Sequence, residues 1–415
     1  MNRRELLQLA GLSGLSIGLG STRSLWADPS SDLPLFLSVH AGGGWDPTSL
    51  CDPKGRANEN SLDPVNHYFI DEIRTPSASS PIKWAPMGAN EAFFQAHYDK
   101  LLIINGIDTS TNNHTTGTRY LNSGQLEEGH PSFAALYTAH RAAHMPLGYI
   151  TNGGYDITRG VVPRTRLGQL SVISRIAEPD LDGDRPFQLE EIQTRLDQYR
   201  TARLSRLLDQ QILPKAQLAM TQLSDSRGGQ NELKRLNANL PNLDSFDTNI
   251  GRQGAIAIAG YRAGLTASAN LTVGGFDTHG NHDQAQANAM SNLTNGLMEL
   301  WNEIERHGLE DKVLIMVNSD FGRTPRYNEG NGKDHWSITS AMFMGAGIRG
   351  NRVIGASDEG VHALPINFDT LQLDESGVKI QPSHLHAALR AWSGIDQSML
   401  HAHYPIHSEA LNIFS

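Results

Sequence analysis

The segment from Val313 to Ser319 constrains the fold of this chain more than any other. Its first five residues are apolar and mostly branched, which is typical of a buried central strand. Asp320 and then Gly322 follow, so the strand ends in a carboxylate and a turn. Because open α/β sheets bind ligands at the carboxyl ends of their parallel strands, Asp320 is a candidate functional residue.

Elsewhere along the chain, other short apolar runs alternate with segments in which apolar residues recur at helical spacing. This alternation predicts an α/β fold with a mostly parallel central sheet, flanked by helices on both faces. The predicted strands are 33–40, 101–105, 147–151, 271–276, 313–317 and 339–344, and the predicted helices are 90–97, 131–143, 252–267, 283–307 and 383–392.

Residues 186–240 differ from the rest, because charged and amide side chains alternate there with Leu and Ile at helical spacing. We interpret this segment as a helical insertion in a single domain that spans residues 28–415. The chain has 415 residues, 39% of them hydrophobic, which is enough for a sizeable core. Its net charge of −10 and the absence of a basic block argue against nucleic-acid binding.

The first 27 residues have the layout of a secretory signal peptide. A short basic head containing Arg3 and Arg4 precedes a mildly apolar stretch, and Ala27 ends a possible cleavage site. The paired arginines match a twin-arginine signal. We therefore expect the twin-arginine machinery to export the protein to the periplasm or the medium. No later apolar run is long enough to span a bilayer, so we expect no membrane span in the mature chain.

Acids and histidines follow several predicted strands. A mixed set of carboxylates and imidazoles of this kind binds one or two divalent ions. Zinc accepts both ligand types, whereas magnesium, manganese and calcium prefer oxygen. We expect the carboxylates and imidazoles to converge within about 5 Å, as shared ligation needs. The candidate metal ligands are Asp46, Asp277, His279, His282, Asp320 and His335.

Two other hydrolase chemistries lack their sequence signals. Cys51 begins a near match to the motif that sulfatases mature to formylglycine, but Gly55 stands where that motif has arginine. The Gly-x-Ser-x-Gly turn of serine hydrolases is absent. The single cysteine also excludes an intramolecular disulfide and a zinc site made of cysteines.

Three motifs resemble a family of twin-arginine-exported proteins, the domain of unknown function 1501. They are Phe276-Asp277-Thr278-His279, Ser319-Asp320-Phe321-Gly322-Arg323-Thr324-Pro325 and Gly332-Lys333-Asp334-His335-Trp336. The family is placed in the alkaline phosphatase and sulfatase superfamily. The resemblance therefore implies an alkaline-phosphatase-like three-layer sandwich with metal ions at the carboxyl edge of its sheet.

The resemblance also implies metal-binding roles. Asp46 would bind one ion, and Asp277 would bind the other together with either His279 or His282. Asp320 matches the acid of an Asp-His pair whose histidine is replaced by Phe321, and His335 matches a late histidine ligand.

The same comparison leaves the nucleophile open. In the superfamily the nucleophile stands at the start of a helix, and the resemblance places that helix at Asn113 to Gly124. Aligning this segment on Gly117 puts His114 at the nucleophile position, with Thr115 next to it. Either Thr115 attacks, or His114 is a ligand or a phosphate acceptor, or covalent catalysis is absent. Arg323 and Arg119 are candidates to hold an anionic substrate by paired hydrogen bonds.

The leading hypothesis is an exported, metal-dependent hydrolase of small phosphate or sulfate esters. The alternative is a non-catalytic periplasmic binding or assembly protein that keeps the fold. The replacement of a superfamily histidine by Phe321, and His114 at the nucleophile position, favour the alternative.

Overall fold

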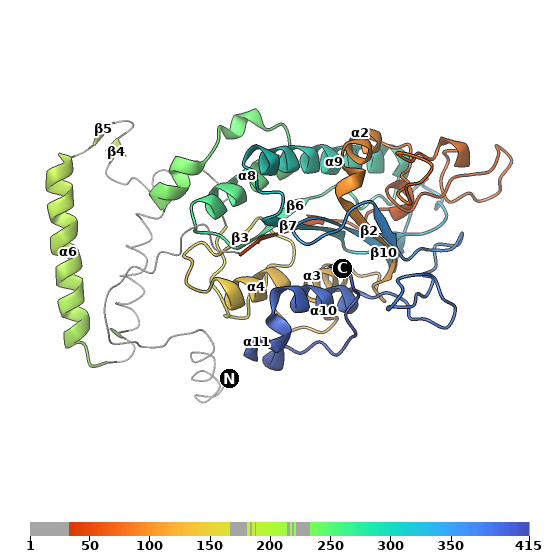
Figure 1. Cartoon of the computed structure of the whole chain (residues 1–415). Helices are drawn as coiled ribbons and strands as arrows, with labels where there is room; N and C mark the ends of the chain where they lie inside the picture. The colour runs from red at the N-terminus through yellow and green to blue at the C-terminus, as the bar shows by residue number, and fades with distance from the viewer. Residues whose placement is uncertain are drawn as a thin grey trace.

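The computed structural model describes residues 33–166, 181–182, 185–186, 188–213, 216–217, 220 and 233–414. The predicted signal peptide, residues 1–27, and parts of the predicted insertion lie outside these residues. A seven-stranded sheet in the order β11-β2-β10-β7-β1-β6-β3 forms the centre (Figure 1). Its strands are β1 (Leu35–Ala41), β2 (Leu101–Asp108), β3 (Tyr149–Thr151), β6 (Ser268–Val273), β7 (Val313–Ser319), β10 (Ile338–Gly345) and β11 (Arg352–Ile354).

The sheet is mostly parallel. Strand β1 pairs in parallel with β6 and β7, and β3 and β11 pair in parallel with β6 and β2. Only β10 runs against its neighbours β2 and β7. The carboxyl ends of β1, β2, β6 and β7 therefore meet at one edge of the sheet, and the loops that follow them gather there.

Alternate side chains of each strand enter two separate cores, as the pleat of a strand requires. Leu35, Leu37 and Val39 of β1 face one core, whereas Phe36 faces the other. Helices cover both faces (Figure 1), which confirms the predicted three-layer sandwich. The first layer contains α2 (Asn90–His97), α8 (Asn249–Arg262) and α9 (His282–Arg306), and the second contains α3 (His114–Ser123), α4 (Phe133–Arg141), α10 (Pro382–Ser393) and α11 (Met399–His403).

The remaining elements lie in the insertion and beside the site. Helix α6 (Glu190–Gln210) falls within the predicted helical insertion, after the short pair β4 (Leu181–Asp182) and β5 (Arg185–Pro186). A second short pair, β8 (Gly322–Arg323) and β9 (His335–Trp336), joins two of the sequence motifs at the edge of the sheet. None of the described helices is both long and apolar enough to cross a membrane.

Candidate metal centre

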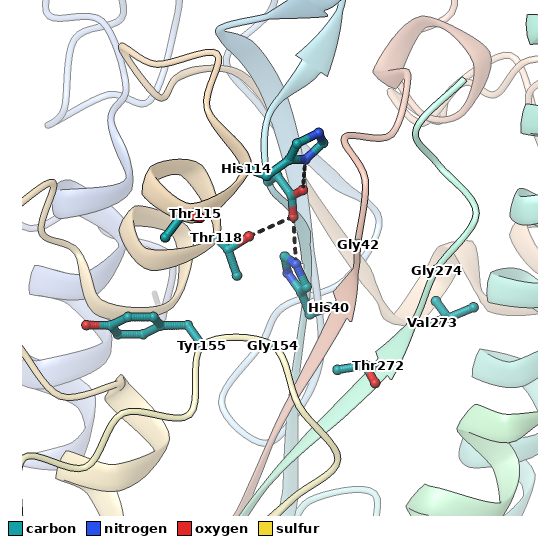
Figure 2. Close-up of a pocket in the computed structure, with 11 residues that line it drawn as sticks. His40, Gly42, His114, Thr115, Thr118, Gly154, Tyr155, Thr272, Val273 and Gly274 are labelled. Carbon is teal, nitrogen blue, oxygen red and sulfur yellow. Dashed lines mark hydrogen bonds and ion pairs between the residues drawn. The ribbon is translucent and has the colours of Figure 1, made fainter. Parts of the chain in front are cut away.

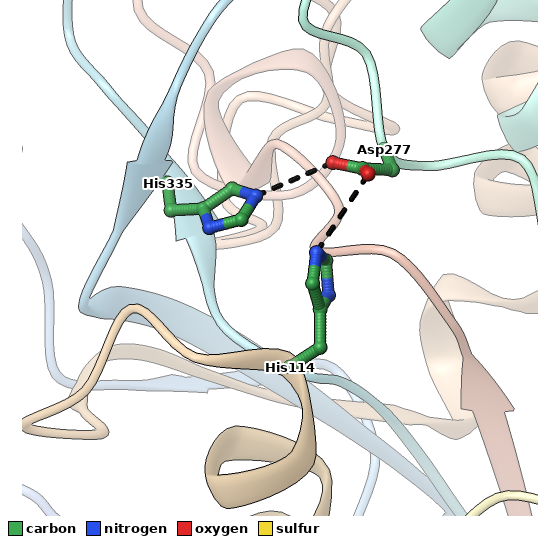
Figure 3. Close-up of side chains that lie close together, drawn as sticks. All are labelled: His114, Asp277 and His335. Atoms are coloured by element: carbon green, nitrogen blue, oxygen red, sulfur yellow. Dashed lines mark hydrogen bonds and ion pairs between the residues drawn. The ribbon is translucent and has the colours of Figure 1, made fainter.

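Three histidine side chains converge on the carboxylate of Asp277, which follows β6; they come from the same loop, from the start of α3 and from strand β9. The Nε2 atoms of His279 and His335 lie 3.0 and 3.3 Å from its Oδ1, and 2.9 Å from each other. On the other side, Nε2 of His114 lies 3.7 Å from Oδ2. The ligand atoms of His114, Asp277 and His335 all lie within 4.8 Å of one another (Figure 3).

The second nitrogen of each imidazole contacts an oxygen that can only accept. Nδ1 of His114 donates to Asp320 Oδ2 at 2.6 Å, and Nδ1 of His279 donates to Asp334 Oδ1 at 2.9 Å. Nδ1 of His335 donates to the carbonyl of Asn112 at 2.8 Å. A neutral imidazole carries one N–H, so in the neutral form each of the three Nε2 atoms would present a lone pair toward Asp277, whereas a doubly protonated ring would donate to it. Orientation of this kind, by a carboxylate or carbonyl behind the ring, is typical of metal-binding histidines.

Asp320, a predicted metal ligand, lies behind His114 and outside the group of atoms around Asp277. Its Oδ1 accepts from His40 Nε2 at 2.7 Å and from Thr118 Oγ1 at 2.9 Å. Its Oδ2 accepts from His114 Nδ1 at 2.6 Å and from Gly43 N at 3.0 Å. These four donors fill the four lone-pair positions of a carboxylate, so in this arrangement Asp320 supports His114. Burial raises the pKa of Asp320, but the hydrogen bond and charge of His40 lower it further, well below its ordinary value.

Asp46 and His282, two further predicted metal ligands, also lie outside the cluster. The carboxylate of Asp46 is fully buried and accepts from Lys333 Nζ at 2.5 Å and from His282 Nε2 at 3.0 Å. It also caps the short 3₁₀ turn that follows it, by accepting from Thr48 N at 2.9 Å. Burial raises the pKa of Asp46, but the Lys333 ammonium and His282 outweigh it, and the net pKa is far below normal. His279, rather than His282, is therefore the histidine that accompanies Asp277.

Arg323 is not available to hold a substrate. It is fully buried, and its guanidinium donates to the carbonyls of Gly43, Gly44 and Lys333 and to Asp277 Oδ1 at 2.8 Å. Its role is to fix Asp277 and the glycine loop after β1. Arg119, the other predicted anion-binding residue, is 8% exposed and bonds the carbonyl of Leu126.

Two glycines and one aromatic residue let the loops approach one another. A Cβ on Gly43, whose φ is +118°, would lie 2.6 Å from the backbone nitrogen of Asp277. A Cβ on Gly117 in α3 would lie 2.2 Å from the carbonyl oxygen of Asp320. Phe321 is fully buried, and its ring centroid lies 4.8 Å from that of His114 and 4.4 Å from that of His335. It therefore supports two imidazoles at the position where a third would be expected.

A pocket of about 510 Å³ adjoins the cluster on the side of His114 and Asp320 (Figure 2). Thr115 and Thr118 line it from the first turns of α3, Tyr155 lines it from the loop after β3, and Thr272 lines it from strand β6. Thr115 is exposed, and within residues 33–166 and 233–414 its hydroxyl has no hydrogen-bond partner. The pocket leaves room for the organic part of a small substrate beside the cluster.

Sequence reasoning does not identify His40 and Lys333 as parts of this arrangement. His40 lies inside the first strand, where its alternation with apolar residues resembles ordinary core packing. Lys333 is wholly buried, an unusual position for lysine; burial lowers its pKa although Asp46 opposes this. No local sequence pattern predicts that Lys333 is buried or that it pairs with Asp46.

Fold and site together define an α/β three-layer protein with an imidazole-rich cluster at the carboxyl edge of its sheet. The chain belongs to the family described as "Protein of unknown function (DUF1501)", whose model matches residues 154–404. Asp277, Asp320 and His335 all lie within that match. No curated protein matches the chain.

Several solved structures are distantly similar. PsFucS1 sulfatase from Pseudoalteromonas sp. is 9% identical, with a TM-score of 0.39 over 100% of this chain and 77% of that one. A sulfatase of Bacteroides thetaiotaomicron is 8% identical, with a TM-score of 0.38 over 92% and 77%. Alkaline phosphatase from the Antarctic bacterium TAB5 is 10% identical, with a TM-score of 0.33 over 76% and 92%. Likeness at this level says nothing about the activity of this chain.

Proposed function

We propose that the protein is a hydrolase of phosphate or sulfate esters that uses one divalent metal ion, bound by Asp277, His114, His279 and His335. One observation carries this proposal: three Nε2 atoms converge on a single carboxylate while every Nδ1 contacts an acceptor. In particular, the Nε2 atoms of His279 and His335 lie 2.9 Å apart. Two neutral rings in this position would bring lone pairs face to face, and these repel unless a cation or an added proton lies between them.

The donor set fits zinc better than the oxygen-preferring ions. Zinc–nitrogen bonds of about 2.0–2.1 Å in a tetrahedron place ligand atoms about 3.3 Å apart. The separations of 2.9, 3.0 and 3.3 Å among Asp277, His279 and His335 are close to that value. Imidazole-rich sites favour zinc and related transition metals, whereas magnesium and calcium take oxygen. Since Asp46 and Asp320 are saturated by donors, the residues support one ion rather than two.

A bound divalent ion would supply Lewis-acid polarisation of the ester and activation of water. The protein's own residues orient this chemistry. Arg323 holds Asp277, and the three acceptors behind the imidazoles fix the direction of their lone pairs. The pocket beside α3 would hold the rest of the ester. Because Thr115 has no base beside it, water is the preferred nucleophile.

A second function, metal binding without catalysis, is favoured by the pocket itself. Among the residues that line it, none is lysine or arginine, and the carboxylate of Asp320 would repel an anionic ester. A periplasmic binding or assembly protein needs no more than that. The two functions share the metal but differ in turnover.

Metal analysis combined with turnover separates the possibilities. Protein purified without chelator should contain one equivalent of zinc and should hydrolyse an aryl phosphate or an aryl sulfate. Asp277→Ala should lose both properties, whereas Asp283→Asn should keep them. Asp283 is a matched control, since it is similarly exposed and also pairs with a histidine, His67. Metal without turnover would support the binding protein, and folded protein that takes up no metal would refute both functions.

We also propose that the twin-arginine machinery exports the protein. The paired Arg3 and Arg4, the apolar stretch and Ala27 support this location. Replacing both arginines by lysine should retain the precursor in the cytoplasm, which fractionation and immunoblotting would detect. Processing that continues unchanged would argue for another route.

A further inference from the structure

We propose that Asp320, clamped by His40 and Thr118, is a positioning residue that fixes His114 as its Nδ1–H tautomer. In this form the Nε2 lone pair of His114 faces Asp277 before any ion arrives. The consequence for metal affinity rests on the proposed function, whereas the tautomer itself does not. Asp320 thus acts on the proposed ion through His114 rather than by direct contact with it.

The hydrogen-bond geometry decides which nitrogen of a neutral His114 carries the proton. An ionised carboxylate only accepts, so the 2.6 Å contact with His114 Nδ1 requires the proton to be on that nitrogen. Without such an acceptor, a neutral imidazole can carry its proton on either nitrogen. A proton on Nε2 would remove the lone pair that a metal needs.

Asp320 itself has little freedom to turn away. Its side chain is 3% exposed, and hydrogen bonds hold both of its oxygens. His40 in turn is anchored, because its Nδ1 lies 2.8 Å from Asn318 Oδ1. A hydrogen-bonded chain therefore runs from the buried Asn318 through His40 and Asp320 to the partly exposed His114. Figure 2 labels His40 and His114 of this chain.

The other two imidazoles have weaker supports. Asp334, behind His279, is 59% exposed, and the Asn112 carbonyl behind His335 belongs to an exposed residue. Water competes with exposed hydrogen bonds, whereas buried ones are held in a low dielectric. Among the three histidines, His114 should therefore have the most strongly fixed tautomer.

The test is nitrogen-15 NMR of histidine-labelled, metal-free protein at about pH 8, with His114 assigned from the signal lost in His114→Gln. The wild type should show His114 protonated at Nδ1. Asp320→Ala should shift His114 toward the Nε2–H form. Asp334→Ala is the matched control, since it should alter His279 and leave His114 unchanged. A wild-type His114 protonated at Nε2 would overturn the proposal, and this measurement does not depend on whether Asp320→Ala folds.

Zinc affinity, measured by chelator competition, gives an independent readout. Asp320→Ala should weaken binding about 10–100-fold, the usual effect of removing a partner behind a metal-binding histidine. Asp320→Asn should lose less zinc affinity than Asp320→Ala, because the amide oxygen can still accept from His114 and Gly43. Unchanged affinity in Asp320→Ala, with wild-type zinc binding intact, would count against the positioning role. An Nδ1–H tautomer in a wild type that binds no zinc would instead refute the proposed metal function alone.

Discussion

Asp277 differs from the other strand-end carboxylates in keeping an oxygen that no donor saturates. Its side chain is 49% exposed, and only the 3.7 Å contact with His114 approaches Oδ2. Burial raises the pKa of Asp277, but the Arg323 hydrogen bond and charge and the adjacent histidines lower it further, so its net pKa lies below the ordinary value. The residue is therefore an anion at neutral pH, as a ligand must be.

The first prediction concerns this charge. Asp277→Asn keeps the shape but removes the anion, so bound zinc should fall at least 100-fold in affinity and hydrolysis should be lost. Mass spectrometry of the native protein and chelator competition would measure the first effect. Retention of one tightly bound zinc in Asp277→Asn would contradict the ligand set proposed above.

A second prediction addresses the nucleophile. Thr115→Val removes a pocket hydroxyl that has no partner among the described residues, so activity on an aryl ester should change less than about tenfold, within the about 1.4 kcal/mol that one hydrogen bond to substrate is worth. A loss of about a thousandfold or more would show that Thr115, rather than water, attacks. Thr116→Val is a suitable control, since Thr116 is in the same turn but does not line the pocket.

Sequence alone identified the residue types at this site better than their roles. Asp277, His279, His335 and the ambiguous His114 were all named, because acids and histidines after strands of one sheet meet at one edge. The roles of Asp46 and Asp320 depend on how many donors reach each carboxylate. Those donors come from positions between residues 40 and 333, so the sequence around each acid does not show how many donors reach it.

At the scale of elements, the segment from β8 to the start of β9 contains two residues of the site, Asp334 and His335, and is anchored by Lys333. Its ammonium lies 2.5 Å from Asp46 Oδ2 and 2.8 Å from Asn66 Oδ1, with no exposed surface. This ion pair joins the β8–β9 segment to the loop after β1. Because Lys333 directly precedes Asp334 and His335 in the sequence, the ion pair also restrains that part of the site.

The third prediction follows from that anchor. Lys333→Met keeps the length of the side chain but leaves Asp46 buried without its main counter-charge. The free energy of unfolding should fall by about 3–5 kcal/mol, the usual cost of breaking a buried pair. Urea denaturation would measure it, with Lys312→Met at an exposed surface position as the control. Equal stability of the two variants would show that the buried pair contributes little.

The strands and long helices were predictable because their periodicity is strong, whereas α3 was not evident from periodicity. Residues 114–118 contain three threonines and a glycine, which are poor helix formers. The helix begins because the Asn113 side chain caps it by accepting from Thr116 N, and it packs on the end of β7 through Gly117. Resemblance to a family, rather than the local pattern, indicated a helix here.

For the whole molecule, the fourth prediction is acid sensitivity. The folded-state pKa values of Asp46 and Asp320 are both depressed below the ordinary value of about 3.9. Their contribution to stability is therefore complete above about pH 4 and is lost as pH falls below it. Each carboxylate adds up to about 1.4 kcal/mol per pH unit to the slope of unfolding free energy against pH. Denaturation at pH 2–6 should show this slope, and Asp46→Asn should reduce it.

The fifth prediction connects the site to the stability of the whole domain. The proposed ligands come from the start of α3, the loop after β6 and strand β9, so an ion bound there would cross-link three segments far apart in sequence. Binding to the folded state alone stabilises it by about 2.7 kcal/mol when zinc is present at a hundred times its dissociation constant. Zinc added to chelator-treated protein should therefore raise the melting temperature by a few degrees, as scanning calorimetry would record.

Two variants test whether this rise in melting temperature comes from the proposed site. Asp277→Asn should melt at the same temperature with or without zinc, while Asp283→Asn should respond as the wild type does. Magnesium should produce a much smaller shift, because three of the four proposed donors are imidazole nitrogens. A zinc response that survives in Asp277→Asn would place the stabilising ion elsewhere, and the convergence of lone pairs on Asp277 would then need a proton, rather than a metal, to explain it.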